Sequence, residues 1–136
     1  MVLSHNDSNP NGTDSNKQKH KFWYARVLGI YHANVVYVGP GMVDYTPKRI
    51  DFLWVRWYQH VNESGSTSGG PCKLHQVYFP PLSADDSFGF LDPADVLRGC
   101  HIIPTFSQHR RYQNSDGGLS GCANDYNDWN RYYIGQ

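Results

Sequence analysis

The sequence predicts a mainly β domain: a small, strongly bent β-barrel with one short helical turn and a disordered N-terminal tail. Aromatic residues make up 15% of the 136 residues, and all four Trp, ten Tyr and six Phe fall in residues 22–136. They occur in short runs together with β-branched residues, a composition that is typical of strands. Six or seven such runs, separated by Gly- and Pro-rich breaks and without a long amphipathic helix, favour a bent barrel over a sandwich.

The chain divides into a polar tail, residues 1–21, and a single β-barrel-like domain, residues 22–136. The tail consists almost entirely of Ser, Asn, Asp, Gly, Thr, Gln, Lys and His. Because it has so little apolar surface to bury, it does not offset the entropy lost on ordering. We therefore expect the tail to be disordered.

The first part of the domain predicts three strands. Residues 22–31 and 34–38 are rich in aromatic and β-branched side chains, with Gly29 as a candidate bulge. Residues 50–58 form the strongest strand, in which Phe52, Trp54, Arg56 and Tyr58 share one face while Leu53, Val55 and Trp57 share the other. Both faces are largely apolar, so we expect a central strand that meets water only at its ends.

The second part of the domain predicts shorter strands and two long loops. The loops span residues 62–71 and 107–128, and strands are expected at residues 74–79, 87–91, 100–103 and 129–134. The clearest local signal is Asp92-Pro93, because Asp caps free N–H groups and Pro suits the first helical position. It predicts a single helical turn over residues 93–97, with Gly99 as the stop.

The composition excludes several classes of protein. Twelve Lys and Arg balance twelve Asp and Glu, and a net charge of zero gives no global attraction to nucleic acid or anionic membranes. No apolar run approaches the ~18 residues of a membrane-spanning helix, and the N-terminus lacks the pattern of a secretory signal. Three widely spaced cysteines fit reduced thiols better than a disulfide framework. We expect an intracellular protein, nuclear or cytoplasmic, that is neither secreted nor bound to a membrane.

The sequence predicts no catalytic residues, no metal site and no cofactor. Cys72 and His75 have C-x2-H spacing, but no second pair with zinc spacing accompanies them. Cys100 and His101 are neighbours on an expected strand and therefore point to opposite faces. The chain has no P-loop, no dinucleotide-binding glycine motif and no nucleophile elbow. A metal- or cysteine-dependent enzyme is accordingly the third hypothesis for the function.

Aromatic residues supply the first candidate binding site. The candidate face comprises Trp54, Tyr58, Trp23 and Tyr24, from the central strand and a neighbouring strand. Rings held at right angles attract a methylated lysine by cation–π interaction, and Asp44 or Asp51 would add negative charge. The competing and favoured interpretation is that these rings fill a small core, because aromatic side chains supply much apolar area per residue.

Basic residues supply the second candidate site. Arg110 and Arg111 lie beside Tyr112, a combination that suits phosphate contacts next to a stacking base. Because the chain has no net positive charge, such a patch has to be local. An accessory nucleic-acid-binding domain is the second hypothesis for the function, and a solvated loop explains the same residues equally well.

Long segments of residues 22–134 resemble a domain of fungal, basidiomycete proteins that are associated with DNA transposons. The segments are FWYARVLGIYHANVVYVGPGMVDYTPKRIDFLWVRWY, FGFLDPADVLRGCHIIPTF and DWNRYYIG. The spacing is also similar to a domain appended to plant En/Spm-type transposases. More distantly, LWVRWY and DPADVLRGCHII resemble bromo-adjacent homology (BAH) modules, which read chromatin or mediate protein contacts.

The resemblance implies a BAH-like barrel that originates in a mobile-element protein and has no catalytic role. The first hypothesis for the function is therefore a non-catalytic interaction module. It would bind a protein or peptide partner, with histone tails of chromatin as one candidate, and Trp54 would carry part of the affinity.

Overall fold

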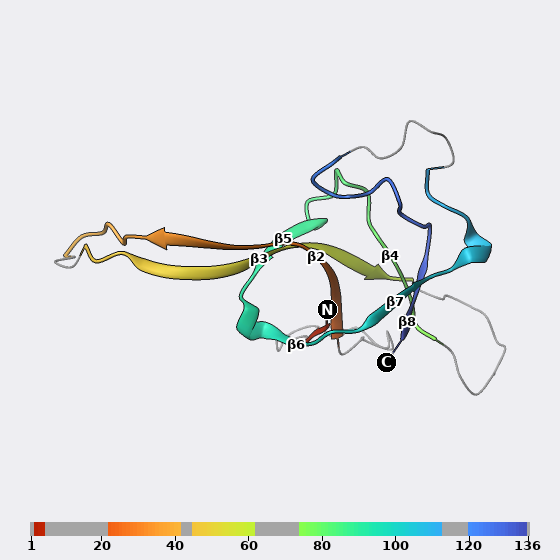
Figure 1. Ribbon diagram of the computed structural model, residues 1–136, viewed down its shortest axis with the longest axis horizontal. Coiled ribbons are helices and arrows are strands. Elements are labelled where there is room, and N and C mark those ends of the chain that lie inside the picture. The colour runs from red at the N-terminus through yellow and green to blue at the C-terminus, as the bar shows by residue number, and fades with distance from the viewer. Residues whose placement is uncertain (1, 5–21, 42–44, 62–73, 113–119, 136) are drawn as a thin grey trace, which may run out of the picture.

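The computed structural model describes residues 2–4, 22–41, 45–61, 74–112 and 120–135, and the expectation of a mainly β fold is confirmed (Figure 1). The strands are β1 (Val2–Ser4), β2 (Phe22–Val35), β3 (Lys48–His60), β4 (Gln76–Tyr78), β5 (Phe88–Leu91), β6 (Val96–Arg98), β7 (His101–Pro104) and β8 (Tyr132–Gly135). Two short 3-10 turns, η1 (Pro93–Asp95) and η2 (Phe106–Gln108), are the helical elements of these residues. None of the helices in the described ranges has the length and apolar character needed to cross a membrane.

The strands form one antiparallel sheet in the order β6-β1-β2-β3-β4-β8-β7, and β5 pairs with β3 beside this path. The predicted closure into a barrel is wrong, because no pairing between the described residues joins β6 to β7. Only Gly99 and Cys100 separate these two strands, so a single segment pairs first with β1 and then with β8. The two ends of the sheet are thus linked by the chain and not by a ladder of hydrogen bonds.

β2 and β3 form a long hairpin whose register runs from Tyr24 opposite Tyr58 to Val35 opposite Lys48. The expected bulge at Gly29 is confirmed: the register shifts between Val27 and Gly29, which leaves one extra residue on β2. β3 is longer than the strand predicted at residues 50–58, since it runs from Lys48 to His60. The strand that was expected at residues 34–38 instead continues β2 and ends at Val35.

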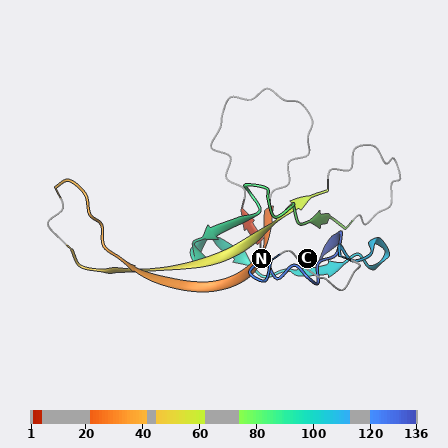
Figure 2. The same cartoon turned by 90° about the horizontal axis from the view of Figure 1, so that it is seen from above.

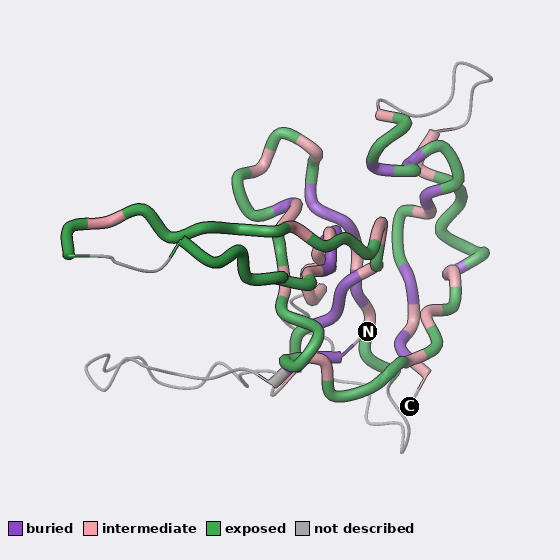
Figure 3. Tube along the Cα trace, turned by 60° about the vertical axis from the view of Figure 1, so that its left-hand side comes forward, coloured by how far each residue is buried: buried purple, intermediate pink, exposed green. Residues whose placement is uncertain are grey.

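The outer half of this hairpin projects away from the rest of the molecule as a two-stranded ribbon (Figures 1 and 2). We call residues 30–41 and 45–52 the arm. Figure 3 shows the arm as mostly exposed, whereas the buried residues lie in the body of the domain. The exposed apolar side chains of the arm are Ile30, Tyr31, Val35, Val36, Tyr37, Val38, Tyr45 and Ile50.

Two hydrophobic cores lie on opposite faces of β3. The larger one contains Tyr58 together with Val2, Tyr24, Val77, Phe79, Tyr132 and Ile134. The smaller one contains Ala25, Leu53 and Val55, with Trp57 packed against it. The expectation of a central strand with two apolar faces is therefore confirmed for the part of β3 inside the body, while its first four residues are exposed in the arm.

The expectation that residues 1–21 form a disordered tail is wrong for residues 2–4. These residues form β1, which pairs with β2 on one side and with β6 on the other. Val2 and Leu3 are 2% and 6% exposed, so burial of their side chains compensates for the ordering of this short strand. Residues 5–21 lie outside the described residues.

The predicted helical turn is confirmed at its start. Asp92 accepts a hydrogen bond from the Ala94 backbone N–H at 2.8 Å, and Pro93 occupies the first helical position of η1. The turn ends at Asp95, two residues earlier than expected, because Val96 is already extended and begins β6.

Candidate functional site

The four residues of the predicted aromatic face do not form one open surface. Tyr24 and Tyr58 are 4% and 8% exposed and belong to the larger core. Trp23 contacts Trp57 edge to face at 5.6 Å between ring centroids, and this places it on the opposite face of the hairpin from Trp54. For Tyr24 and Tyr58 the core interpretation is confirmed, because both residues lie in the inner half of the hairpin, where β2 and β3 pack inside the body of the domain.

Trp54 instead belongs to a continuous row of five rings, which we call the aromatic face: Tyr31, Phe52, Trp54, Phe88 and Phe90. Tyr31 lies directly opposite Phe52 across β2 and β3, and Trp54 lies directly opposite Phe90 across β3 and β5. Trp54 stacks on Phe88 with 5.3 Å between ring centroids and touches Phe90 at 4.8 Å. Contacts of Phe52 with Tyr31 at 5.8 Å and with Phe90 at 5.4 Å complete the row.

The aromatic face is most open to solvent at Tyr31, one end of the row, and at Phe90, its middle ring. Phe90 is 70% exposed and Tyr31 is 52% exposed, while the other three rings are half-buried. Of the two carboxylates that were expected near the rings, Asp51 is exposed and pairs with Arg49 at 2.9 Å, and Asp44 lies outside the described residues. Sequence reasoning missed Phe88 and Phe90, although their spacing of two on an expected strand placed both on one face.

Arg56 lies on the same face of β3 as Trp54, and its side chain belongs to a buried group of charged residues. Its Nη1 atom lies 2.6 Å from the Asp128 carboxylate, and both side chains are 0% exposed. Arg26 from β2 reaches the other carboxylate oxygen at 2.9 Å, and the Tyr132 hydroxyl donates to that same oxygen at 3.3 Å. Both guanidinium groups also lie over the Phe79 ring, at 4.5 Å for Arg26 and 3.9 Å for Arg56.

Sequence reasoning also missed Asp128, which was assigned to a mobile polar loop. In the structure, the last part of that expected loop is tied down. The Arg111 backbone N–H donates to the Asp128 carbonyl oxygen at 2.9 Å, and Arg110 forms an isolated bridge with Trp129. The sequence near Asp128 does not show that this carboxylate is buried, because its two arginine partners lie 72 and 102 residues away along the chain.

Burial changes the acid–base behaviour of the groups around Asp128. It raises the pKa of the Tyr58 phenol far above the ordinary value of 10.0, and it also raises the pKa of Tyr132. Burial alone lowers the pKa of the Arg26 guanidinium, but the attraction of Tyr58 and Asp128 outweighs this effect and leaves its pKa raised. Both phenols are therefore neutral hydrogen-bonding groups at neutral pH.

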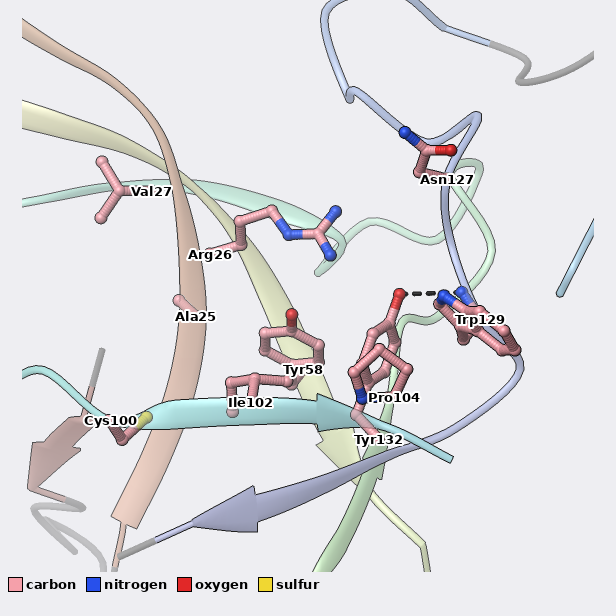
Figure 4. A pocket seen from close by; sticks show the side chains of 10 residues that line it. All are labelled: Ala25, Arg26, Val27, Tyr58, Cys100, Ile102, Pro104, Asn127, Trp129 and Tyr132. Atoms are coloured by element: carbon pink, nitrogen blue, oxygen red, sulfur yellow. Dashed lines mark hydrogen bonds between the residues drawn. The ribbon is translucent and has the colours of Figure 1, made fainter. Parts of the chain in front are cut away.

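A pocket of about 370 Å³ opens beside these groups (Figure 4). Its lining residues are Ala25, Arg26, Val27, Tyr58, Cys100, Ile102, Pro104, Asn127, Trp129 and Tyr132. Figure 4 shows the Arg26 guanidinium and the Tyr58 hydroxyl turned toward one another on one side and Trp129 with Tyr132 on the other. The Trp129 backbone N–H donates to the Tyr132 hydroxyl at 2.9 Å. We call this site the arginine pocket.

The predicted nucleic-acid residues divide between two environments. The Arg110 guanidinium lies over the Trp129 ring at 5.5 Å and donates to Asn127 at 3.3 Å, at the rim of the arginine pocket. The Arg111 guanidinium turns inward and donates to the Phe79 carbonyl oxygen at 2.9 Å. Arg111 and Tyr112 line a second cavity, of about 520 Å³. The three residues therefore do not present one exposed stripe, and nucleic-acid binding stays a prediction.

The residues that were weighed for metal or thiol chemistry are also separated. Cys72 lies outside the described residues, Cys100 is half-buried and lines the arginine pocket, and Cys122 is exposed. Within the described ranges, no three His, Cys, Asp or Glu side chains come together as metal ligands. The hypothesis of a metal- or cysteine-dependent enzyme stays a prediction.

Comparison of the chain with protein-family models, with curated proteins and with solved structures gave no match.

Proposed function

We propose that this chain is a non-catalytic interaction module that docks a protein partner on its arm and aromatic face. The observation that carries the proposal is the concentration of exposed apolar side chains on a ribbon outside both cores. Ile30 is 77% exposed and Val38 is 79% exposed, values that are far from those of the core residues. Exposed apolar side chains in such number on one ribbon are typical of surfaces that bind other proteins.

The backbone of the arm supports the same proposal. Beyond Tyr24, the outer edge of β2 has no partner strand among the described residues, and the same holds for the outer edge of β3 over residues 48–52. Unpaired strand edges are templates for an added strand, and proteins normally cover or disrupt them. A partner that lies along the arm would bury its exposed apolar side chains and would also form hydrogen bonds with the unpaired backbone groups of the strand edge.

The surface chemistry favours a protein over a nucleic acid. In the arm, the cations Lys48 and Arg49 are accompanied by many more exposed apolar groups, and Arg49 is already paired with Asp51. Aromatic side chains are the groups that most often carry the binding energy of protein interfaces. Phe90 and Tyr31 are the two most exposed rings of such a group.

The resemblance to mobile-element and BAH-type domains supports a chromatin tail as the first partner to test. Exposed aromatic rings attract a methylated lysine by cation–π interaction, and Phe90 and Tyr31 are the most exposed rings of the aromatic face. A histone tail also binds in an extended conformation, which suits the open edge of the arm.

The proposal is tested by photo-crosslinking at the aromatic face. We would incorporate p-benzoylphenylalanine in place of Phe90 and, as a control, in place of Tyr126, which is 56% exposed in a different part of the molecule. After irradiation in an extract of the source cells, a discrete protein should crosslink at position 90 and not at position 126. Identical products at both positions, or none at position 90, would overturn the proposal.

A binding measurement then separates the candidate partners. Trimethylated and unmethylated histone-tail peptides are titrated against the wild-type chain and against Phe90→Ala and Trp54→Ala. Loss of about tenfold in affinity with the fold retained supports an aromatic binding site. If DNA or RNA binds instead, and its affinity falls steeply with salt, the nucleic-acid hypothesis replaces the proposal.

A further inference from the structure

Two guanidinium groups meet one carboxylate beside the arginine pocket, among the residues that the structure describes. Arg26 and Arg56 share the single carboxylate of Asp128, and the contact of Arg56 is the shorter one, at 2.6 Å against 2.9 Å. The Tyr132 hydroxyl donates a hydrogen bond to the same Asp128 oxygen that Arg26 contacts. Unbalanced charge away from water is costly, so an additional anion at Arg26 would be stabilised.

Arg26 is the member of this group that a ligand can reach. Its side chain is 30% exposed and lines the pocket, whereas Arg56 and Asp128 are 0% exposed. Within the described residues, Nε and Nη2 of Arg56 have no hydrogen-bond partner. Among these residues Asp128 is thus the acceptor of the Arg56 side chain, and Arg26 shares that carboxylate.

The rest of the pocket is suited to a flat apolar group. Trp129 provides half-buried aromatic surface, the nearly buried rings of Tyr58 and Tyr132 form part of the wall, and Ile102 and Pro104 close one side (Figure 4). The volume of about 370 Å³ lies in the range of small-molecule sites, which are mostly apolar with a few polar groups that fix orientation. Arg110 adds a second cation nearby, since it contacts the lining residues Trp129 and Asn127.

We propose that the arginine pocket binds a carboxylate attached to a flat apolar or aromatic group, with the carboxylate on Arg26. A carboxylate matches the geometry of a guanidinium and supplies a negative charge next to the Arg26 side chain, which a ligand can reach. The body of the ligand packs against Trp129. Such a ligand is either a free carboxylic acid or the C-terminus of a peptide that ends in an aromatic residue.

The proposal does not depend on the function proposed for the arm. The pocket is lined by the body of the domain, and no residue of the aromatic face lines it. The two sites therefore fail or succeed separately, since substitutions of Phe90 leave the pocket unchanged and substitutions of Arg26 leave the aromatic face unchanged.

The test compares benzoate with benzamide, which has the same shape and no charge. Both are titrated into the wild-type chain while the indole N–H signal of Trp129 is followed by two-dimensional NMR. Benzoate should bind in the low-millimolar range and benzamide about tenfold or more weakly, because the charged contact with Arg26 is lost. Equal affinities, or no shift of the Trp129 signal with benzoate, would overturn the proposal.

Variants then locate the carboxylate. Arg26→Gln should weaken benzoate binding about tenfold, while Arg49→Gln, an arginine of the arm, should leave it unchanged. If Arg26→Gln does not fold, Arg26→Lys serves instead: it keeps the charge but loses the two parallel hydrogen bonds, and weaker binding is again expected. Unchanged binding in the folded variant contradicts the assignment of Arg26.

Two peptides distinguish the sources of the carboxylate. A short peptide that ends in Phe with a free carboxylate is compared with the same peptide amidated at its C-terminus. Tighter binding of the free peptide than of benzoate indicates a peptide C-terminus, and the reverse order indicates a free acid. If neither peptide form nor benzoate binds, the pocket is not a carboxylate site.

Discussion

Asp128 shows how much a single side chain holds together. It joins β2, β3 and the segment before β8 through Arg26, Arg56 and Tyr132. Asp128→Asn keeps the size of the side chain and removes its charge, so Arg56 is left buried without a counter-ion. We expect the free energy of unfolding to fall by about 3–5 kcal/mol, measured by urea denaturation.

The matched control is Asp51→Asn, which removes a carboxylate from an exposed pair. Asp51 and Arg49 are 56% and 63% exposed, and pairs of this kind contribute little because water screens them. The expected change is within about 0.5 kcal/mol. Equal losses in the two variants would show that Asp128 is not a buried counter-ion.

Tyr58 makes stability depend on pH in the alkaline range. Its pKa is raised in the folded chain, while in the unfolded chain it stays near 10.0. Above pH 10 the unfolded state therefore loses a proton that the folded state keeps. The stabilising contribution is fully present below pH 10 and is lost as pH rises toward the folded pKa.

We accordingly expect the wild-type free energy of unfolding to decrease more steeply above pH 10 than that of Tyr58→Phe. The difference in slope is about 1.4 kcal/mol per pH unit, which is one proton's contribution. Urea denaturation of both chains at several alkaline pH values measures it. Parallel curves would mean that the Tyr58 hydroxyl ionises as readily in the folded chain as in the unfolded one.

At the scale of elements, the short strand β1 is expected to contribute strongly to the free energy of unfolding. Leu3 is 6% exposed and lies where β1 meets both β2 and β6. Leu3→Ala removes buried apolar surface, and we expect a loss of about 2–3 kcal/mol in the free energy of unfolding. Leu97→Ala is the control, since Leu97 is 55% exposed, and its change should stay within about 0.5 kcal/mol. A small effect at Leu3 would indicate that β1 is not docked in solution.

Elements that depend on neighbouring residues were predictable, and those that depend on distant partners were not. The η1 turn follows from Asp92-Pro93, and the bulge follows from Gly29 inside an apolar run, because each signal lies within a few residues. β1 is only three residues long, and its burial depends on β6, more than ninety positions further along the chain. The sequence around Val2 therefore carries no local signal for it.

The candidate site divides in the same way. Alternation along β3 correctly placed Phe52, Trp54 and Tyr58 on one face, but not the change from exposed to buried between Trp54 and Tyr58. That change depends on where Phe79 and Tyr132 pack, since both contact the Tyr58 ring. The role of Asp128 was hidden for the same reason, because its partners Arg26 and Arg56 come from β2 and β3.

At the scale of the whole molecule, one hairpin serves two purposes. Its inner half contributes Tyr24, Leu53, Val55 and Tyr58 to the two cores, and its outer half contributes exposed apolar side chains to the arm. A two-stranded ribbon without a packed face is only marginally stable in water. The arm is therefore ordered by its continuity with the body.

This difference within one hairpin is measurable by amide hydrogen exchange. In the isolated chain, we expect the hydrogen-bonded amides of residues 30–35 and 48–52 to open at lower free energy than those of residues 24–27 and 53–58. The reason is that both groups have the same antiparallel pairing, while the buried residues of the hairpin, such as Tyr24, Val55 and Tyr58, lie in the second. Addition of the crosslinked partner should slow exchange in the arm and leave the body nearly unchanged. Equal protection of the two halves without any partner, rising with protein concentration, would instead identify a second copy of this chain as what covers the arm.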